Sequence, residues 1–173
     1  YQYMFFDLKT LPPEQMGLYK YAAILVDYKS MSIDVQLIKF KDSAGQAFRA
    51  ACSKRGVQFL PYQTTVHYDG DGANASVIQA ALEIGCRAEP TIPYRQSLNM
   101  AELAIRMITD AAKKLCFEAK MHPCYLGIAM CCAAYTHSFV ATTTTRGSKT
   151  PYEILWGVKP NIDHLRQFGS LCW

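Results

Sequence analysis

The sequence lacks any hydrophobic run as long as the ~18 residues that a membrane-spanning helix requires. Its first residues also lack the positively charged start and the cleavage site of a signal peptide. The seven cysteines do not suggest a disulfide framework, because Cys116, Cys124, Cys131 and Cys132 lie within apolar helical stretches and not between turns. These absences predict a soluble intracellular protein, with no membrane partner and with reduced cysteines.

Charge is also sparse, with 18% charged and 50% hydrophobic residues. This composition excludes intrinsic disorder, and 173 residues are enough for one domain with a packed core. The formal net charge of +4 is compatible with a polyanionic partner but is weak support for one. Because the sequence begins with Tyr1 and stops at Trp173, shortly after a Phe-Gly turn signal, we expect it to be a fragment of a longer protein.

Hydrophobic periodicity and turn residues predict an α/β protein. The predicted elements are strands at 1–8, 19–28 and 32–40, a helix from 42 or 43 to 56, a strand at 62–68, a helix at 74–85, a strand at 87–92, and helices at 98–120 and 123–140. The last helix is apolar nearly all round, which predicts burial, and the tail at 151–173 is expected to be irregular. This order is typical of a mixed five-stranded sheet with helices on both faces.

Three carboxylates are placed where α/β proteins carry chemistry. Asp7 lies among the apolar residues of the first strand, where a carboxylate is costly unless it is paired or binds a cation. Asp69 ends the fourth strand. Glu102 lies in the first turns of the long helix, opposite an apolar stripe that we expect to include Met100 and Met107.

Gathered together, these three acids would repel one another, and divalent cations would turn that repulsion into binding. Hard oxygen ligands favour Mg²⁺ or Mn²⁺, and two such ions support in-line phosphoryl transfer. Each acid alone has an ordinary explanation: Asp7 as a turn residue, Asp69 in an Asx-turn, and Glu102 in a salt bridge with Arg106. The combination of the three favours the catalytic interpretation.

The most specific motifs lie near the end of the chain. Segment 149–160 reads KTPYEILWGVKP, and segment 164–169 reads HLRQFG. In this order the two segments resemble the integrase core of copia-type retrotransposons, a branch of the retroviral integrase superfamily with an Asp, Asp, Glu triad. The resemblance covers nearly the whole chain and implies an RNase H-like fold.

The upstream matches assign the triad by resemblance. Asp7 matches the first acidic strand of the family, and segment 24–30, ILVDYKS, resembles the strand with an aspartate-tyrosine-serine signature. Segment 68–72, YDGDG, stands where the family has serine-aspartate-asparagine-glycine-glycine, so Asp69 takes the role of second acid. Segment 93–102, PYRQSLNMAE, ends at Glu102 as third acid, and these three residues are the expected catalytic residues and metal ligands.

This sequence also departs from the family pattern. Leu103 follows the third acid where the family usually has arginine, and the glycine-proline after the first acid is absent. Asp71 is an alternative second ligand, since it lies on the same glycine-rich loop as Asp69. Asp69 is favoured because a strand end is stiffer than a loop tip flanked by glycines.

The resemblance implies metal-dependent 3′-processing and strand transfer with two Mg²⁺ or Mn²⁺ ions. The expected partners are element ends, target DNA and further copies of the chain, in the nucleus or a virus-like particle. Residues 1–140 would form the core, and 141–173 a C-terminal extension that begins the next polyprotein region. The alternatives are a catalytically decayed nucleic-acid-binding or assembly domain and a nuclease that only hydrolyses.

DNA contacts are expected near the triad, because cations and amides can hold phosphates there. A solvated polar helix face explains each residue equally well when it is taken alone. The candidates are Arg95, Gln96 and Asn99 before the long helix and Arg106, Lys113 and Lys114 along it.

Overall fold

The computed structural model describes residues 2–55, 63–69, 75–91, 100–141 and 148–170, and its centre is a five-stranded sheet. The strands are β1 (Gln2–Thr10), β2 (Tyr21–Asp27), β3 (Ile33–Ile38), β4 (Thr64–Tyr68) and β5 (Arg87–Pro90), and their order across the sheet is β3-β2-β1-β4-β5. The first three strands are antiparallel, whereas β4 runs parallel to β1 and β5 parallel to β4. The predicted mixed sheet is confirmed.

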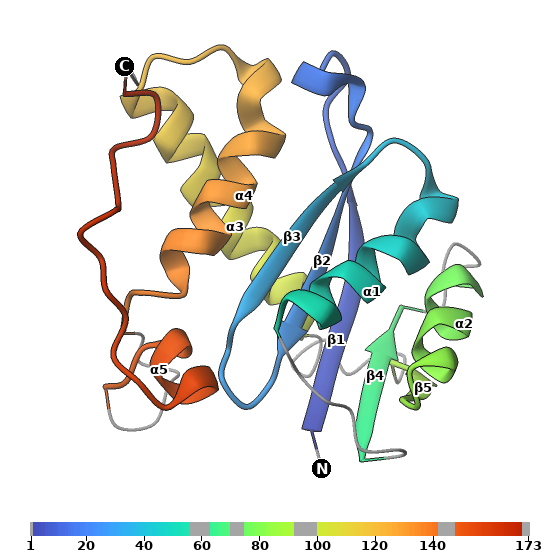
Figure 1. Cartoon of the computed structure of the whole chain (residues 1–173). Helices are drawn as coiled ribbons and strands as arrows, with labels where there is room; N and C mark the ends of the chain where they lie inside the picture. The colour runs from blue at the N-terminus through green and yellow to red at the C-terminus, as the bar shows by residue number, and fades with distance from the viewer. Residues whose placement is uncertain (1, 56–62, 70–74, 92–99, 142–147, 171–173) are drawn as a thin grey trace.

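Helices cover both faces of this sheet (Figure 1). One face carries α1 (Ala44–Lys54) and α2 (Ala75–Glu83), and the other carries α3 (Met100–Glu118) and α4 (Leu126–His137). Short 3₁₀ turns lie at Met16–Leu18, Lys41–Ser43 and Pro123–Tyr125, and a last short helix is α5 (Pro151–Trp156). The expected three-layer α/β architecture is therefore present.

Two hydrophobic cores, one on each side of the sheet, follow from the alternation of the strands. In β2, Ala23 and Leu25 face the core under α1 and α2, while Ile24 and Val26 face the core under α3 and α4. This strand is buried on both faces and consequently reads as a continuous apolar run. In β3, by contrast, Ile33 and Val35 pack on the α3–α4 side, as the alternation predicts.

The predicted apolar stripe of α3 is confirmed at Ala104 and Ile108 but not at Met107. The helix rests on Ala101, Ala104, Ile108, Ala112 and Cys116, while Met107 is 39% exposed. Small side chains let α3 approach α4 and the sheet closely, so the alanines, and not Met107, occupy the contact. The expectation for Met107 was wrong because large apolar residues were assumed to mark the core.

The helix α4 also differs from expectation. Gly127, Ala129, Met130 and Ala133 are buried, but Tyr135 is 47% exposed. An apolar composition all round the helix thus does not imply burial all round. The six cysteines in the described ranges are free thiols, with Cys52, Cys86 and Cys116 fully buried and the other three half-buried.

The tail is more regular than predicted, because α5 has a complete set of end signals. The Thr150 hydroxyl accepts a hydrogen bond from the Glu153 amide at 3.1 Å, Pro151 occupies the first turn, and Gly157 ends the helix at φ 73°. A row of aromatic rings, Tyr135, Phe139, Tyr152 and Trp156, packs α5 against the end of α4.

No helix in the parts of the chain that the structure describes is long and apolar enough to cross a membrane.

Candidate active site

The parallel ladder between β1 and β4 positions the two strand acids. Phe5 pairs with His67 and Phe6 pairs with Tyr68, which is the last pair of the ladder. Asp7 and Asp69 each follow directly, so they lie at the same level of neighbouring strands. Because side chains alternate along a strand, the Asp7 carboxylate lies on the face that carries Phe5, and Asp69 follows two residues after His67, whose ring stacks on Phe5.

Asp7 is half-buried in the middle of the sheet, opposite Ile24 of β2. Its Oδ1 accepts a hydrogen bond from the Leu8 amide at 2.6 Å. Phe5, two residues earlier, packs against the core beneath α3 and α4, which places Asp7 on the α3 side of the sheet. The first acid therefore faces the layer that carries the third.

Asp69 is exposed at the point where β4 ends. The preceding carbonyl, that of Tyr68, accepts hydrogen bonds from the Thr91 amide at 2.8 Å and the Thr91 hydroxyl at 3.0 Å. These bonds tie the end of β4 to the segment after β5. The backbone next to Asp69 is thus fixed by the sheet.

Glu102 lies in the first turn of α3 and is exposed. Its neighbours Ala101 and Ala104 are buried in the core, so the carboxylate lies on the outer part of the helix, as predicted. A negative charge in the first turn also interacts favourably with the helix dipole. Since α3 contacts both β1 and β2, Glu102 belongs to the layer that Asp7 faces.

The structure brings Asp7 and Asp69 to adjacent strand positions, and their carboxylate oxygens are the ligand type that Mg²⁺ prefers. Within the described ranges, no three His, Cys, Asp or Glu side chains form a group that could hold a metal ion. The assembly of Glu102 with the two strand acids therefore stays a prediction. Asp71, the alternative second ligand, lies outside the described residues.

An aromatic patch beside the two strand acids was not predicted from the sequence. The His67 ring stacks on Tyr3 and on Phe5, with centroids 5.8 and 5.1 Å apart, and Phe5 also contacts Tyr28 at 6.2 Å. Tyr3 and Tyr28 are 43% and 54% exposed. The alternate spacing of Tyr3 and Phe5 was the available signal, but their meeting with His67 required the strand register.

The predicted DNA-contacting residues fall into two groups. Arg106, Lys113 and Lys114 are exposed on α3, and Lys113 lies 3.9 Å from the Asp110 carboxylate. Arg95, Gln96 and Asn99 lie outside the described residues.

The aspartate of the signature 27–30 has a structural role. Asp27 is 1% exposed, and its Oδ2 accepts hydrogen bonds from the Ser30 amide at 2.9 Å and the Ser30 hydroxyl at 2.5 Å. These bonds close the turn between β2 and β3. This buried acid therefore stabilises the hairpin in which it lies.

No protein-family model matches the sequence. Among curated proteins, the sequence is 22% identical over 173 residues to the retrovirus-related Pol polyprotein from transposon RE1 of Arabidopsis thaliana. That alignment covers 99% of this chain but 12% of the polyprotein, so the chain spans about an eighth of the relative it matches.

Retroviral integrases are among the solved structures with a similar fold. The HTLV-2 integrase catalytic core domain in complex with magnesium, in its trimeric form, has a TM-score of 0.65 and 17% identity, over 88% of this chain and 94% of that one. An intasome of simian T-cell lymphotropic virus in complex with PP2A regulatory subunit B56 gamma has a TM-score of 0.71 and 18% identity, over 95% of this chain and 58% of that one. The chain thus has the RNase H-like fold of these integrase cores, and its sequence is similar to a segment of a retrotransposon Pol polyprotein.

Proposed function

We propose that this chain is the catalytic core of a copia-type retrotransposon integrase, which processes DNA 3′ ends and joins them to target DNA. The single observation that supports the proposal is that Asp7 and Asp69 each directly follow the last residue pair, Phe6 and Tyr68, of the parallel β1–β4 ladder. Carboxylates that are brought together at neighbouring strand ends favour the binding of a divalent cation.

Asp7, Asp69 and Glu102 would hold Mg²⁺ or Mn²⁺ through their carboxylate oxygens. When bound, two such ions activate the attacking oxygen and stabilise the leaving 3′-oxygen of a phosphodiester. Asp7 lies in β1 and Asp69 directly follows β4, whereas Glu102 lies in the separate helix α3. The chain's own contribution is to hold these ligands rigidly at the phosphodiester.

DNA would lie across α3 and the adjoining sheet face. The exposed cations Arg106, Lys113 and Lys114 can contact phosphates, which gives affinity without sequence preference. The exposed rings of Tyr3 and Tyr28, which lie nearer the beginning of β1 than Asp7, offer stacking surfaces for an unpaired base. Arg95, Gln96 and Asn99 complete the proposed DNA interface.

We extend the proposal to assembly and location. The HTLV-2 integrase core has been solved in dimeric and trimeric forms, which supports self-association for a chain with this fold. The polyprotein relative supports action in a virus-like particle or in the nucleus, where element DNA meets its target. Residues 141–173 would lead from the core into the following polyprotein region.

The test is a strand-transfer assay with a labelled oligonucleotide that mimics an element end and a supercoiled target plasmid. We expect Mg²⁺-dependent joined products, which Asp7→Asn and Glu102→Gln abolish. Glu118→Gln, an exposed acid at the other end of α3, is the matched control and keeps activity. Nicked plasmid without joined product would instead identify a nuclease, and neither product, with DNA binding retained, would identify a non-catalytic binding domain.

A further inference from the structure

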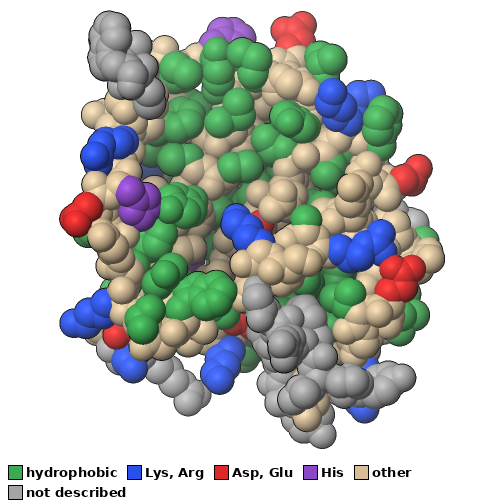
Figure 2. Space-filling model, viewed as in Figure 1, with side chains coloured by type: hydrophobic (Ala, Val, Ile, Leu, Met, Phe, Trp, Pro, Cys, Tyr) green, Lys and Arg blue, Asp and Glu red, His purple; other side chains and the backbone are tan. Residues whose placement is uncertain are grey.

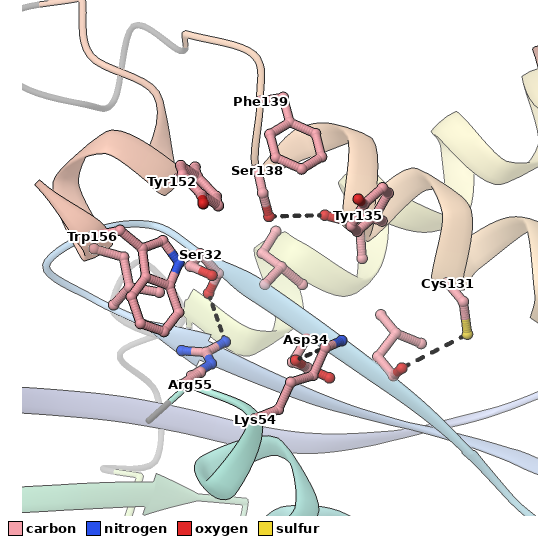
Figure 3. Close-up of a pocket in the computed structure, with 14 residues that line it drawn as sticks. Ser32, Asp34, Lys54, Arg55, Cys131, Tyr135, Ser138, Phe139, Tyr152 and Trp156 are labelled. Carbon is pink, nitrogen blue, oxygen red and sulfur yellow. Dashed lines mark hydrogen bonds and ion pairs between the residues drawn. The ribbon is translucent and has the colours of Figure 1, made fainter. Parts of the chain in front are cut away.

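A pocket of about 240 Å³ lies on the opposite edge of the sheet from β4 and β5 (Figure 3). Its walls come from the end of α1, the edge strand β3, the last turns of α4, and α5. Figure 3 shows Arg55 on one side of the space and the rings of Tyr152 and Trp156 on another. Nothing in the proposed integrase chemistry uses this pocket.

Arg55 is the unusual member of the lining. The residue is 5% exposed, and its Nη2 donates to the carbonyl oxygens of Leu25 at 3.3 Å and Ser32 at 3.2 Å. Its Nε and Nη1 are buried and have no hydrogen-bond partner in the structure described. Buried donors left without acceptors are costly, so a ligand that supplies acceptors would be bound favourably.

The nearest acid of the lining already has other donors. The Asp34 carboxylate lies 3.5 Å from the Lys54 ammonium and accepts a hydrogen bond from Gln36 at 2.9 Å. Burial lowers the pKa of Arg55, and the charges of Asp34 and Asp27 oppose that shift, so the guanidinium stays cationic. The lining thus contains two cations, Arg55 and Lys54, and one carboxylate.

The remaining walls are apolar and aromatic. Phe139 contacts Tyr152 with centroids 5.6 Å apart, and Tyr152 contacts Trp156 at 6.3 Å. In the space-filling view, a broad hydrophobic patch over α5 lies beside a basic side chain (Figure 2). The pocket therefore combines a cationic end with a ring-lined side, which suits a small molecule with one acidic group and one flat apolar group.

We propose that this pocket binds a small organic anion, an aromatic carboxylate or phosphate ester, with its acidic group on Arg55 and its ring against Tyr152 and Trp156. The volume of about 240 Å³ is below the ~300–1,000 Å³ typical of pockets for drug-sized ligands, so the ligand is small. The inference does not depend on the proposed integrase function, since β3 is separated from β1 by β2.

The test follows Trp156 fluorescence in the 173-residue chain carrying Trp173→Phe, which leaves Trp156 as the single tryptophan. The probes are benzoate, phenyl phosphate and the neutral benzamide, at constant ionic strength. We expect a saturable change with at least one anion, about 10- to 100-fold tighter than with benzamide, the range for a charge-assisted hydrogen bond. The tighter of the two anions identifies the acidic group that the pocket prefers.

Arg55→Met removes the charge while keeping an apolar stem, and it should reduce anion binding to the level of benzamide. Arg49→Met is the matched control, because Arg49 lies on α1 and pairs with Glu83 of α2, away from the pocket. If Arg55→Met does not fold, the comparison of the anions with benzamide in the parent chain still tests whether the pocket prefers an anion. Equal binding of all three probes, no binding, or unchanged anion binding by folded Arg55→Met would overturn the proposal.

Discussion

Phe6 of β1 and Tyr68 of β4 form the last pair of a parallel ladder, and the residue that follows each of them is an aspartate. Strand pairing is specific to a single register wherever one face is buried, because a slip by one position would reverse every side chain. In this register Met4 pairs with Val66 in the core on the other face, while Asp7 and Asp69 each follow the last pair.

We propose Asp69, and not Asp71, as the second acid, because Asp69 directly follows the last pair of the β1–β4 ladder. We expect Asp69→Asn to lower Mg²⁺-dependent strand transfer by about 100-fold or more, a loss of ~3 kcal/mol in transition-state stabilisation. Asp71→Asn should leave most of the activity. The measurement is the initial rate of joined product for both variants, side by side. The reverse ranking would move the second ligand onto the loop.

The exposed cations of α3 should act through phosphates. We expect Arg106→Gln to weaken DNA binding similarly for all sequences. It should also reduce the slope of log binding constant against log salt concentration by about 1, which corresponds to the release of one counterion fewer. Lys20→Gln removes an exposed charge just before β2 and is the control. Fluorescence anisotropy with two unrelated duplexes at several salt concentrations measures both slopes. An unchanged slope for Arg106→Gln would remove this residue from the DNA interface.

The two helices on the other face meet at a glycine. A Cβ atom on Gly45 of α1 would lie 2.2 Å from the Ser76 carbonyl oxygen of α2. Gly45→Ala should therefore destabilise the fold by about 1–3 kcal/mol through overpacking, although alanine favours an isolated helix by ~1 kcal/mol. Denaturant unfolding measures this, with the exposed neighbour Gln46→Ala as control. A stability gain for Gly45→Ala would mean that α1 and α2 are not in this contact.

The C-terminal helix depends on its cap. We expect Thr150→Ala to lower the free energy of unfolding by about 1 kcal/mol, because the Glu153 amide loses its hydrogen-bond acceptor. Thr150→Ser keeps a hydroxyl at this position and should retain the stability of the parent chain. Hydrogen exchange should show faster exchange at the amides of 153–157 in Thr150→Ala than in the serine variant. Equal protection in the two variants would show that packing of Tyr152 on Phe139, and not the cap, holds α5.

Strand alternation made much of the sheet predictable from the sequence. The period of two in β3 predicted the correct face for Ile33 and Val35, because the alternation of apolar and polar side chains determines which face of a strand is buried. The sequence also contains the end signals of α5, which are threonine, proline and glutamate at 150, 151 and 153 and glycine at 157. These signals predict a helix in the tail that was expected to be irregular.

Other features could not be predicted because they arise from segments distant in sequence. Three of the five buried residues of α3 are alanines, and whether an alanine lies inside or outside a core depends on its neighbours in space. Arg55 follows an ordinary helix and resembles a surface residue in the sequence, yet β2 and β3 enclose it. Asp7 and Asp69 were predictable only in part. Each acid could be identified in the sequence, but their positions after the last pair of the β1–β4 ladder could not.

The central claim is that Asp7, Asp69 and Glu102 share divalent cations. The most direct test is a crystal structure of the chain with Mn²⁺, in which anomalous scattering locates the metal. We predict Mn²⁺ within about 2.0–2.3 Å of carboxylate oxygens of Asp7 and Asp69, with Glu102 completing the site. Mn²⁺ bound elsewhere while the Asp7 and Asp69 carboxylates hold none, or Glu102 turned away from a metal held by those two, would contradict the account.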